Sequence, residues 1–450
     1  MIFIISAPRN ARSASTLTRV NIQETMIKTT EPKILVIGGG FGGIRAALEL
    51  EKFKLPGAKI TLVSDKTHFE YHAALYRVVT GRSPLEVCVP LSEIFKGKNV
   101  EVLRDRILSV DLEAQAAEGF FGSRHPFDYL VLALGSETSY MNIPGLAEHS
   151  FGFKSISEAL RLKKHFHELF ESCSKASTEA AEKVCLMHFV VVGAGASGVE
   201  LAGELALYSQ KLAETHNVAR SLITIDLIEA SSRVLPLFSE GTSKKVEKRL
   251  RDLGVNIFVN RPMERGEIES VMVRGLNMKT ETIIWTAGVK PNELYGKIPG
   301  VEFDKKGRLV VDEYLRVKNF KNVFAVGDGA STPFSGMAQT AVYDGRIAAA
   351  NIKNEILGKS LKKYEPPKPY HSIPVGPGWA ATVLGSISLY GYVGWILRRA
   401  ADLRYFLTIL PFKKAYLAFA SGKTVCESCS ICLPDEENPK VALNLKEIKT

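Results

Sequence analysis

Runs of apolar residues alternate with glycine-rich turns in the first part of the chain. Residues 33–38 form a continuous apolar run of buried-strand length, and the turn Gly38-Gly-Gly-Phe-Gly-Gly43 follows at once. A helical pattern over 44–53 comes next, and a second apolar run over 59–63 ends near Asp65. Strand, glycine turn, helix, strand and acid in this order predict a unit that binds a dinucleotide.

The glycines of this first turn have separate structural roles. Gly38 permits a tight turn, Gly40 lets the backbone approach a pyrophosphate, and Gly43 lets the helix pack closely on the strand. Free N–H groups at the start of the helix then point at the phosphates. Asp65, 22 residues beyond Gly43, is placed to accept a hydrogen bond from a ribose hydroxyl. The cofactor-binding residues predicted in this unit are Gly38, Gly40, Phe41, Gly42, Gly43 and Asp65.

The same pattern recurs later in the chain. An apolar run over 189–192 leads into a turn with Gly193, Gly195 and Gly198, then a helix over 199–208 and a strand over 223–228 that ends at Glu229. One glycine turn alone can simply change the direction of the chain, but two with flanking strand, helix and acid indicate two nucleotide sites. From Gly198 to Glu229 there are 31 residues, more than the usual ~20, so 209–221 is interpreted as extra helix and loop.

Three further buried strands end at glycine. Residues 127–135 and 281–288 end at Gly135 and Gly288, which makes the two halves look structurally related. The run 322–328 ends in Gly327-Asp328 and precedes a helical pattern over 337–356. An aspartate here can hydrogen-bond a sugar-alcohol chain while the following helix N-terminus faces a phosphate.

Length and composition exclude several classes of protein. A chain of 450 residues corresponds to about three folded units, and no apolar run reaches the ~18 residues of a transmembrane helix. Six cysteines are too few for a disulfide scaffold and favour a reducing compartment. Cys426, Cys429 and Cys432 form a C-x-x-C-x-x-C run without a fourth ligand, so we expect free thiols and no metal site.

These motifs resemble those of the two-dinucleotide-binding-domain flavoproteins of the pyridine nucleotide-disulfide oxidoreductase type. Within that superfamily the chain is similar to the type II NADH dehydrogenases, which are single-subunit NADH:quinone oxidoreductases that pump no protons. The resemblance covers about residues 33–420. The segments that show it are 36–43, 132–136, 192–204, 285–288, 323–328 and Ala338-Gln339 with Ala341.

The resemblance implies two cofactors, FAD and NADH. It assigns Gly38, Gly40, Gly43, Asp65 and Asp328 to FAD, and Gly193, Gly195, Gly198 and Glu229 to NADH. Further cofactor-binding candidates are Gly135, Gly288, Gly327, Ala338 and Gln339. The fold class implied is α/β: two Rossmann-like dinucleotide-binding domains, the NADH domain inserted in the FAD domain, plus a C-terminal membrane-associating helical region.

The implied reaction is a ping-pong hydride transfer from NADH to the flavin, followed by transfer of two electrons to a membrane quinone. Two residues are predicted to be catalytic. Glu200 resembles the family's glutamate near the nicotinamide–flavin junction and would relay protons; the alternative is a helix-start carboxylate favoured by the macrodipole. Gln339 would contact the quinone; the alternative is a plain polar helix residue.

The chain departs from the family pattern at three places. Ser64 stands where the family commonly has its ribose acid, with Asp65 one position later. The segment 68–73 replaces a stretch that usually contains Gln-Pro, so the loop near the flavin is expected to differ. Tyr343 replaces a glutamine of the quinone-associated pattern, so the acceptor side departs from the family more than the donor side does.

The basic residues point to a membrane surface. The chain has a formal charge of +10, and between Glu355 and Val425 ten basic residues face three acids. Val393, Ile396, Ala400, Leu403, Leu407 and Leu410 recur at helical spacing, while Arg398, Asp402 and Arg404 fall elsewhere on the helix. We expect this helix to lie on an anionic membrane, with nucleic acid excluded as a partner. The alternative is an ordinary helix packed on the flavin domain.

The predicted organisation assigns every segment. We expect a disordered leader or mis-assigned start at 1–32, the FAD-binding domain at 33–155 and 290–357, the NADH-binding domain at 156–289, a membrane-associating region at 358–425 and a polar tail at 426–450. The predicted location is peripheral, on the cytoplasmic face of the cell membrane. Residues 1–23 contain Arg9, Arg12 and Arg19, several serines and threonines and no acid, so a transit peptide over residues 1–25 and a mitochondrial location are the alternative. A homodimer is left open.

Other functions share parts of this pattern. A sulfide:quinone oxidoreductase has the same fold but works through cysteines beside the flavin, and residues 329–425 contain none. A soluble FAD-dependent NAD(P)H reductase of a ferredoxin-type carrier is a second alternative. A redox sensor that binds nucleotides without useful turnover is the alternative outside the enzymes.

Overall fold

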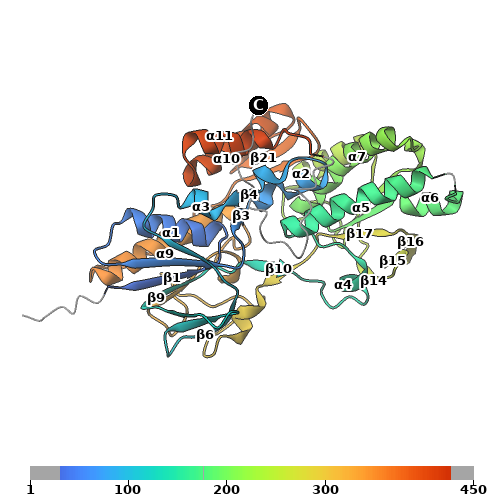
Figure 1. The fold of residues 1–450 in the computed structure, drawn as a ribbon. Coiled ribbons are helices and arrows are strands. Elements are labelled where there is room, and N and C mark those ends of the chain that lie inside the picture. The colour runs from blue at the N-terminus through green and yellow to red at the C-terminus, as the bar shows by residue number, and fades with distance from the viewer. Residues whose placement is uncertain (1–30, 176, 427–450) are drawn as a thin grey trace, which may run out of the picture.

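The computed structural model describes residues 31–175 and 177–426 of the chain. The predictions for a leader and for the thiols of Cys429 and Cys432 lie outside these ranges. Two parallel sheets, each with helices on one face, stand side by side, and the last two helices lie above the first sheet (Figure 1).

The first sheet has five parallel strands in the order β19-β9-β1-β2-β5. These are β1 (Lys33–Ile37), β2 (Lys59–Ser64), β5 (Glu101–Arg104), β9 (Tyr129–Leu132) and β19 (Val323–Ala325). Alternate residues of β1 face opposite sides, as the pleat requires. Ile34 and Val36 pack in one hydrophobic cluster with α1 (Phe41–Lys52) and α9 (Ala338–Ile356). Leu35 and Ile37 pack in a second cluster with the antiparallel sheet of β6 (Ile107–Asp111), β7 (Ala116–Gly119) and β8 (Arg124–Pro126).

The second sheet repeats this plan with four parallel strands in the order β13-β12-β11-β17. These are β11 (His188–Val192), β12 (Thr224–Ile228), β13 (Val255–Phe258) and β17 (Thr282–Trp285). Its helices are α5 (Ile156–Ser174), α6 (Ala180–Leu186), α7 (Ala196–His216) and α8 (Glu240–Asp252). The antiparallel strands β14 (Met263–Gly266), β15 (Ser270–Val273) and β16 (Leu276–Lys279) cover its other face.

Two short strands connect the sheets. The chain leaves the first sheet after β9, forms the second sheet, and returns to the first at β19. The outgoing strand β10 (Ser136–Thr138) pairs antiparallel with the returning strand β18 (Val289–Pro291). The predicted fold class, with one dinucleotide-binding unit inserted in the other, is therefore confirmed.

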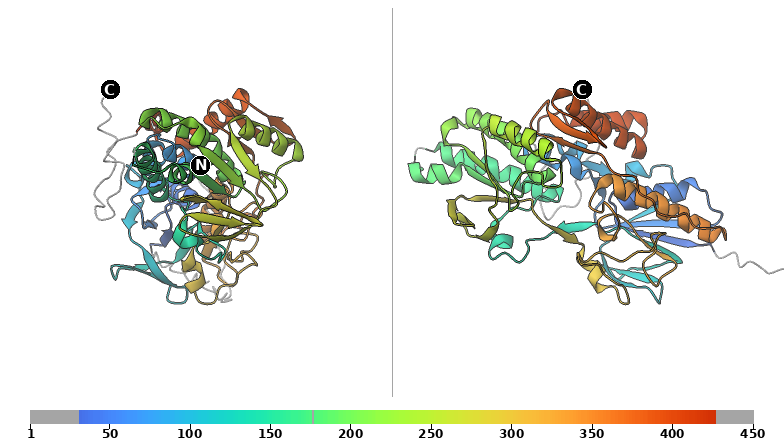
Figure 2. Two further views of the ribbon diagram at one scale, coloured as in Figure 1. Left: turned by 90° about the vertical axis from the view of Figure 1, so that its right-hand side faces the viewer. Right: turned by 180° about the vertical axis from the view of Figure 1, so that it is seen from behind.

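The C-terminal segment packs across the first sheet's helical layer (Figure 2). It contains β20 (His371–Pro374), β21 (Ala380–Leu384), β22 (Ile387–Leu389), α10 (Tyr392–Ile409) and α11 (Phe412–Ser421). Beneath it lie β3 (His68–Glu70), α2 (Leu75–Val79), β4 (Cys88–Pro90) and α3 (Leu91–Ile94), while α4 (Leu146–His149) precedes the second sheet. No helix in the described part of the chain combines the length and apolar character that crossing a membrane requires.

Helix α7 explains the long gap before Glu229. It begins at Ala196, three residues before the predicted start, and continues to His216, where Asn217 in the left-handed conformation ends it. A short 3₁₀ turn then leads into β12. The extra residues therefore lengthen the helix and its connection, as interpreted for 209–221.

Candidate cofactor and redox site

The first glycine turn joins β1 to α1 and leaves room over the start of the helix. Gly38 has a φ of +115°, and a Cβ there would lie 2.2 Å from the carbonyl oxygen of Ala133. A Cβ on Gly43 would lie 2.0 Å from the carbonyl oxygen of Gly38. At Gly40, the N-cap of α1, nothing lies within 4 Å of an added Cβ. An open helix N-terminus of this kind fits a pyrophosphate.

The second glycine turn has the same geometry. Gly193 has a φ of +104°, and a Cβ on Gly198 would lie 1.9 Å from the carbonyl oxygen of Gly193. Gly195, the N-cap of α7, again has no atom within 4 Å of an added Cβ. The chain therefore presents two cradles of similar shape, and the residues of both fit a dinucleotide.

Two other residues of the first turn have their side-chain positions filled by protein. A Cβ on Gly42 would lie 2.9 Å from a methyl group of Val326, so α1 packs tightly on the end of β19. The Phe41 ring contacts the rings of Phe69 and Tyr405 at centroid distances of 4.9 and 5.0 Å. Phe41 thus packs toward the C-terminal region, which leaves its backbone as the part available to a cofactor.

Glu229 lies directly at the second turn. Its carboxylate accepts hydrogen bonds from the backbone N–H groups of Ala194, at 2.8 Å, and Ser231, at 2.7 Å. Arg233, four residues on, donates to the carbonyl oxygens of residues 235 and 236 and to the Ser243 hydroxyl. Its guanidinium is therefore held within its own loop and is poorly placed to bind a 2′-phosphate.

On the first sheet, Ser64 occupies the position that Glu229 has on the second. The N–H of Gly38 donates to the carbonyl of Val63, just as Gly193 donates to the residue before Glu229. The residue after Val63 is Ser64, which is buried beneath the turn, whereas Asp65 is exposed. A ribose contact by Asp65 stays a prediction, and Ser64 is the hydroxyl that the register places nearer the turn.

Gly135 and Asp328 meet at the carboxyl ends of β9 and β19. The Asp328 carboxylate accepts a hydrogen bond from the Ser136 hydroxyl and lies 3.6 Å from the Lys154 ammonium. Gly135, with a φ of +71°, has no atom within 4 Å of an added Cβ. Sequence reasoning missed Lys154, because a single lysine outside a motif gives no signal.

Asp344 is a second residue that the motifs did not reveal. It is buried inside α9 and accepts hydrogen bonds from the N–H of Gly327, at 2.9 Å, and the Tyr364 hydroxyl, at 2.7 Å. Burial raises the pKa of Asp344 to about 6. The carboxyl group therefore fixes the turn that precedes Asp328. Its only sequence signal was an acid in the middle of a helix rich in alanine and apolar residues.

At the other connection, Gly288 begins the return to the first sheet. Its carbonyl accepts from the Ser139 N–H at 3.0 Å, and a Cβ there would lie 2.5 Å from the Ser139 carbonyl oxygen. The two connecting segments therefore approach too closely for a side chain at this position.

The start of α9 is held by the segment that follows it. Ala338 is its first residue, and the Gln339 amide both donates to the carbonyl of Tyr370, at 2.9 Å, and accepts from its N–H, at 3.4 Å. The Tyr343 hydroxyl donates to the carbonyl of Glu365 at 2.9 Å. Both side chains thus anchor residues 365–370. A quinone contact by Gln339 stays a prediction.

Glu200 lies in the first turns of α7, where α2 and α10 approach. Burial raises its pKa to about 7, against the lowering effect of Arg398 and Arg77. The hydroxyl of Tyr76, buried on α2, interacts electrostatically with the same two arginines and with Glu200. A carboxyl group with a pKa near neutrality can both accept and release a proton under ordinary conditions.

The inner face of α10 is charged, which corrects the predicted orientation of this helix. Arg398 and Asp402 form an ion pair at 2.7 Å, Arg399 pairs with Glu86 at 2.6 Å, and all four residues are buried. We expected Arg398 and Asp402 to lie off the apolar face of a helix that rests on an anionic membrane. That expectation was wrong, because Arg398 and Arg399 pair inside the protein with carboxylates, and Arg77 pairs with the same two, those of Glu86 and Asp402.

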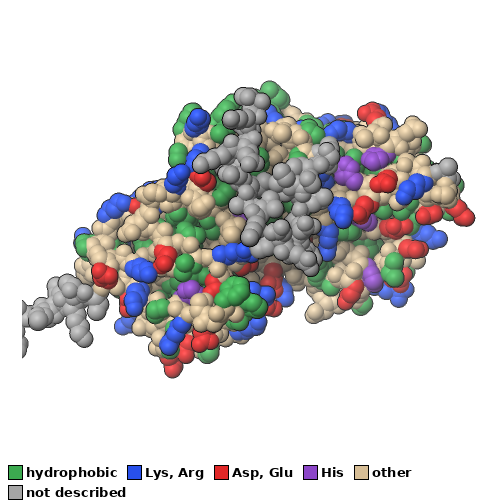
Figure 3. All heavy atoms as spheres, in the orientation of Figure 1, with side chains coloured by type: hydrophobic (Ala, Val, Ile, Leu, Met, Phe, Trp, Pro, Cys, Tyr) green, Lys and Arg blue, Asp and Glu red, His purple; other side chains and the backbone are tan. Residues whose placement is uncertain are grey.

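The outer face of α10 is apolar and exposed. Val393, Ile396 and Leu407 are 56%, 47% and 42% exposed, whereas Leu410 is buried. Phe412 and Tyr416 of α11 extend this face, which we call the apolar ridge, and Figure 3 shows apolar and basic side chains over this part of the molecule. One side of the helix packs on the first sheet's unit, as the alternative expected, and the other side is exposed; its contact with a membrane stays a prediction.

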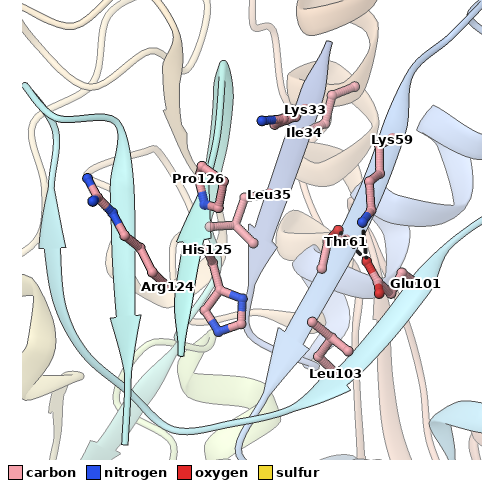
Figure 4. A pocket seen from close by; sticks show the side chains of 10 residues that line it. All are labelled: Lys33, Ile34, Leu35, Lys59, Thr61, Glu101, Leu103, Arg124, His125 and Pro126. Carbon is pink, nitrogen blue, oxygen red and sulfur yellow. Dashed lines mark hydrogen bonds and ion pairs between the residues drawn. The ribbon is translucent and has the colours of Figure 1, made fainter. Parts of the chain in front are cut away.

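A cavity of about 420 Å³ lies elsewhere (Figure 4). It is lined by Lys33 and Lys59, at the amino ends of β1 and β2, and by Arg124 and His125 of β8. The glycine turns are at the opposite, carboxyl ends of the strands. This cavity is therefore separate from the cradles described above.

Comparisons with known proteins agree with this architecture. Residues 32–345 match the family described as pyridine nucleotide-disulphide oxidoreductase. A type II NADH:quinone oxidoreductase of Mycobacterium tuberculosis, NdhA, is 30% identical over 399 residues, which cover 83% of each chain. The same organism's Ndh is 29% identical and covers 87% of this chain and 89% of its own.

Solved structures share the fold. NDH2 from Plasmodium falciparum in complex with NADH superposes with a TM-score of 0.78 at 18% identity, covering 87% of this chain and 98% of that one. The sulfide:quinone oxidoreductase of Aquifex aeolicus superposes with a TM-score of 0.68 at 19% identity, covering 86% and 92%. The chain belongs to the pyridine nucleotide-disulphide oxidoreductase family, and within it to the type II NADH:quinone oxidoreductases. The resemblance to the type II NADH dehydrogenases is therefore confirmed. The prediction of an enzyme that uses FAD and NADH is confirmed with it.

Proposed function

We propose that the protein oxidises NADH and reduces a quinone, with FAD as the intermediate redox group. The observation that supports this most directly is the pair of open glycine turns at the carboxyl edges of two sheets, joined by paired strands β10 and β18. In this arrangement the first turn, with Asp328, holds FAD and the second, with Glu229, holds NADH. Bound FAD supplies hydride acceptance and two-electron donation.

The proposed segments follow from these roles. Residues 33–155 and 290–357 form the FAD-binding domain, and 156–289 form the NADH-binding domain. The glycines at 38, 40, 43 and 135 and the Gly327 turn bind or shape the FAD site. Those at 193, 195, 198 and 288 do so for NADH. NAD leaves before the quinone is reduced, which gives ping-pong kinetics.

Glu200 exchanges a proton beside the site of hydride transfer. Its surroundings and its pKa near 7 support this role better than that of a helix-start carboxylate alone. On the acceptor side, Gln339 positions the 365–370 segment, and its amide is the proposed contact of the quinone.

The apolar ridge is the proposed contact with an anionic membrane. Aromatic residues lie at both of its ends, Tyr392 and Phe412, and exposed cations Arg404 and Lys413 lie beside it. A lipid-soluble quinone would reach the site from this side. We propose a peripheral protein on the cytoplasmic face of the membrane; a homodimer stays a prediction.

The two buried cysteines among the described residues give no support to cysteine chemistry. Cys88 is buried, and burial raises its thiol pKa above the ordinary value; the same holds for Cys173. A thiol held in its protonated form is a weak nucleophile. The likeness to a sulfide:quinone oxidoreductase therefore concerns the fold.

One experiment tests the proposed function. The protein is purified, its flavin is identified after denaturation, and NADH oxidation is followed with and without a short-chain quinone. We expect the flavin to be FAD. NADH should bleach its absorbance, and a short-chain quinone should restore that absorbance by reoxidising the flavin. Bleaching without reoxidation by any quinone would contradict the quinone reductase activity and favour a ferredoxin-type acceptor or a redox sensor.

A further inference from the structure

One lysine of the second sheet's unit reaches into the first sheet's unit. Lys154 comes shortly before α5, and its ammonium lies 3.6 Å from the carboxylate of Asp328, at the turn that follows β19. The two side chains are 28% and 23% exposed. An ion pair that is partly shielded from solvent is screened less by water and salt than one at the open surface. The side chain of Lys154 therefore belongs to the Asp328 turn.

The backbone around Lys154, in contrast, is fixed to the second sheet's unit on both sides. Before it, Phe151 exchanges two backbone hydrogen bonds of 2.8 Å with β17. After it, Ser155 and Glu158 form a capping box at the start of α5, and Glu158 also accepts from the N–H of Lys154 at 2.7 Å. The backbone of Lys154 therefore has a fixed position, and only its side chain crosses to the first unit.

The two partners of Asp328 contact the same oxygen of its carboxylate. The Ser136 hydroxyl, on the strand β10 that crosses between the units (Figure 1), donates to Oδ2, and the Lys154 ammonium lies against Oδ2 as well. No hydrogen bond or ion pair to Oδ1 is present among residues 31–175 and 177–426. One oxygen is therefore held by protein, and the other is left as an acceptor for a hydroxyl group of a ligand.

A second acid lies behind the same turn. Asp344 is buried and accepts from the N–H of Gly327 at 2.9 Å. Burial raises the pKa of Asp344, and the negative charge of Asp328 raises it further. Two carboxylates at such close quarters repel each other when both are ionised. Lys154 is the cation that pairs with Asp328 in the described part of the chain, so it offsets the negative charge at this turn.

We propose that Lys154 is a positioning residue of the flavin site: together with Ser136 it holds Oδ2 of Asp328, which leaves Oδ1 to accept from a hydroxyl group of the sugar-alcohol chain of FAD. The inference rests on the proposed role of Asp328 in binding FAD. It makes the NADH-binding unit a contributor to the FAD site, because the residue that holds Asp328 is anchored in that unit.

The test measures the affinity for FAD by equilibrium dialysis of the holoenzyme against graded concentrations of FAD. Lys154→Met removes the ammonium and keeps a side chain of similar length, so the Kd of FAD should rise about fivefold. Lys154→Arg keeps the charge and should restore most of the affinity. Lys290→Met is the matched control. Lys290 pairs with Glu137 at 3.1 Å across β10 and β18, next to Ser136, and its loss should leave the Kd unchanged.

A double-mutant cycle distinguishes positioning from a general loosening of the structure. Asp328→Asn should raise the Kd of FAD about tenfold. In that background Lys154→Met should change the Kd by less than about twofold, because the charge that Lys154 pairs with is gone. If Lys154→Met loses its flavin during purification, Lys154→Gln takes its place in the cycle.

Three outcomes would overturn the inference: an unchanged Kd in Lys154→Met, an equal rise in Lys290→Met, or equal effects of Lys154→Met with and without Asp328. If Asp328→Asn weakens FAD binding and one of these outcomes is found, only the role of Lys154 fails. If Asp328→Asn binds FAD as tightly as wild type does, the proposed role of Asp328 fails, and the inference fails with it.

Discussion

At the scale of single residues, Gly40 and Gly43 separate cofactor binding from folding. An added Cβ meets nothing within 4 Å at Gly40, but it would lie 2.0 Å from a backbone oxygen at Gly43. We therefore expect Gly40→Val to fold and to lose FAD, because the side chain would fill the space for the pyrophosphate. Gly43→Ala should instead lower the thermal unfolding temperature. Flavin absorbance per protein and thermal unfolding measure both; full flavin retention in Gly40→Val would disprove the assignment of this turn.

Glu229 should set the choice of nucleotide. A carboxylate at this position accepts from a ribose 2′-hydroxyl and repels a 2′-phosphate, and Arg233 is held by its own loop. Wild type should prefer NADH over NADPH. Glu229→Gln should lower the ratio of their kcat/KM values by about tenfold or more, ~1.4 kcal/mol. Arg233→Met is the control and should leave the ratio unchanged. Equal kcat/KM values for the two nucleotides in wild type would refute the assignment.

Asp344 gives a prediction about pH. Its pKa rises from 3.8 to about 6 in the folded protein because it is buried. The folded state then binds the extra proton between about pH 4 and 6, so this group's contribution to stability is lost as the pH rises through that window. Asp344→Asn, which keeps an acceptor for Gly327, should gain stability relative to wild type with rising pH, by at most ~3 kcal/mol at about pH 8. Denaturant unfolding at about pH 4 and 8 measures this; a pH-independent difference would contradict it.

At the scale of elements, the ion pairs on the inner face of α10 hold this helix in place. Asp402 accepts from Tyr71, Arg77, Arg398 and Arg399. Asp402→Asn should reduce the free energy of unfolding by about 3 to 5 kcal/mol, because buried guanidinium groups lose their counter-charge. Glu240→Gln breaks the exposed ion pair with Lys244, which has the same i,i+4 spacing, and should leave the free energy of unfolding unchanged. Hydrogen exchange of α10 amides should rise only in Asp402→Asn; unaltered exchange would contradict this role.

The local sequence pattern was sufficient to predict the helices, strands and turns, but it was insufficient to predict the contacts between them. The glycine turns, the strands before them and the acid of the second unit were predictable, because their backbone geometry admits few residue types. The orientation of α10 was not. Apolar residues at helical spacing look the same whether they face a core or solvent. Ala73, which accepts from Arg398, and Arg77, which pairs with Asp402, lie more than 300 residues away from α10 in sequence. The position of Ser64 followed from the family pattern, whereas its burial beneath the turn needed the structure.

At the scale of the whole molecule, the apolar ridge should control access of a membrane quinone without affecting NADH. The ridge is on the outer side of α10, whereas the second glycine turn is in the other sheet's unit. Removing the C-terminal segment would take Asp402 from Arg77 and Arg399 from Glu86 and so disrupt the buried ion pairs, so substitutions on the ridge are the better test. We choose the double variant Ile396→Glu, Leu407→Glu, because both side chains are more than 40% exposed and neither belongs to the buried ion pairs on the inner face of α10.

This double variant should reduce flavin with NADH at the wild-type rate and use short-chain quinone normally. Its binding to anionic vesicles and its rate with long-chain quinone in those vesicles should fall by tenfold or more, because two added carboxylates oppose apolar insertion and attraction to anionic lipid together. Ile268→Glu, on an exposed apolar residue of the second unit, is the control for added charge. Salt should weaken wild-type binding only in part, since the apolar contribution is not screened. If the double variant co-sediments with vesicles as well as wild type does, another surface anchors the protein.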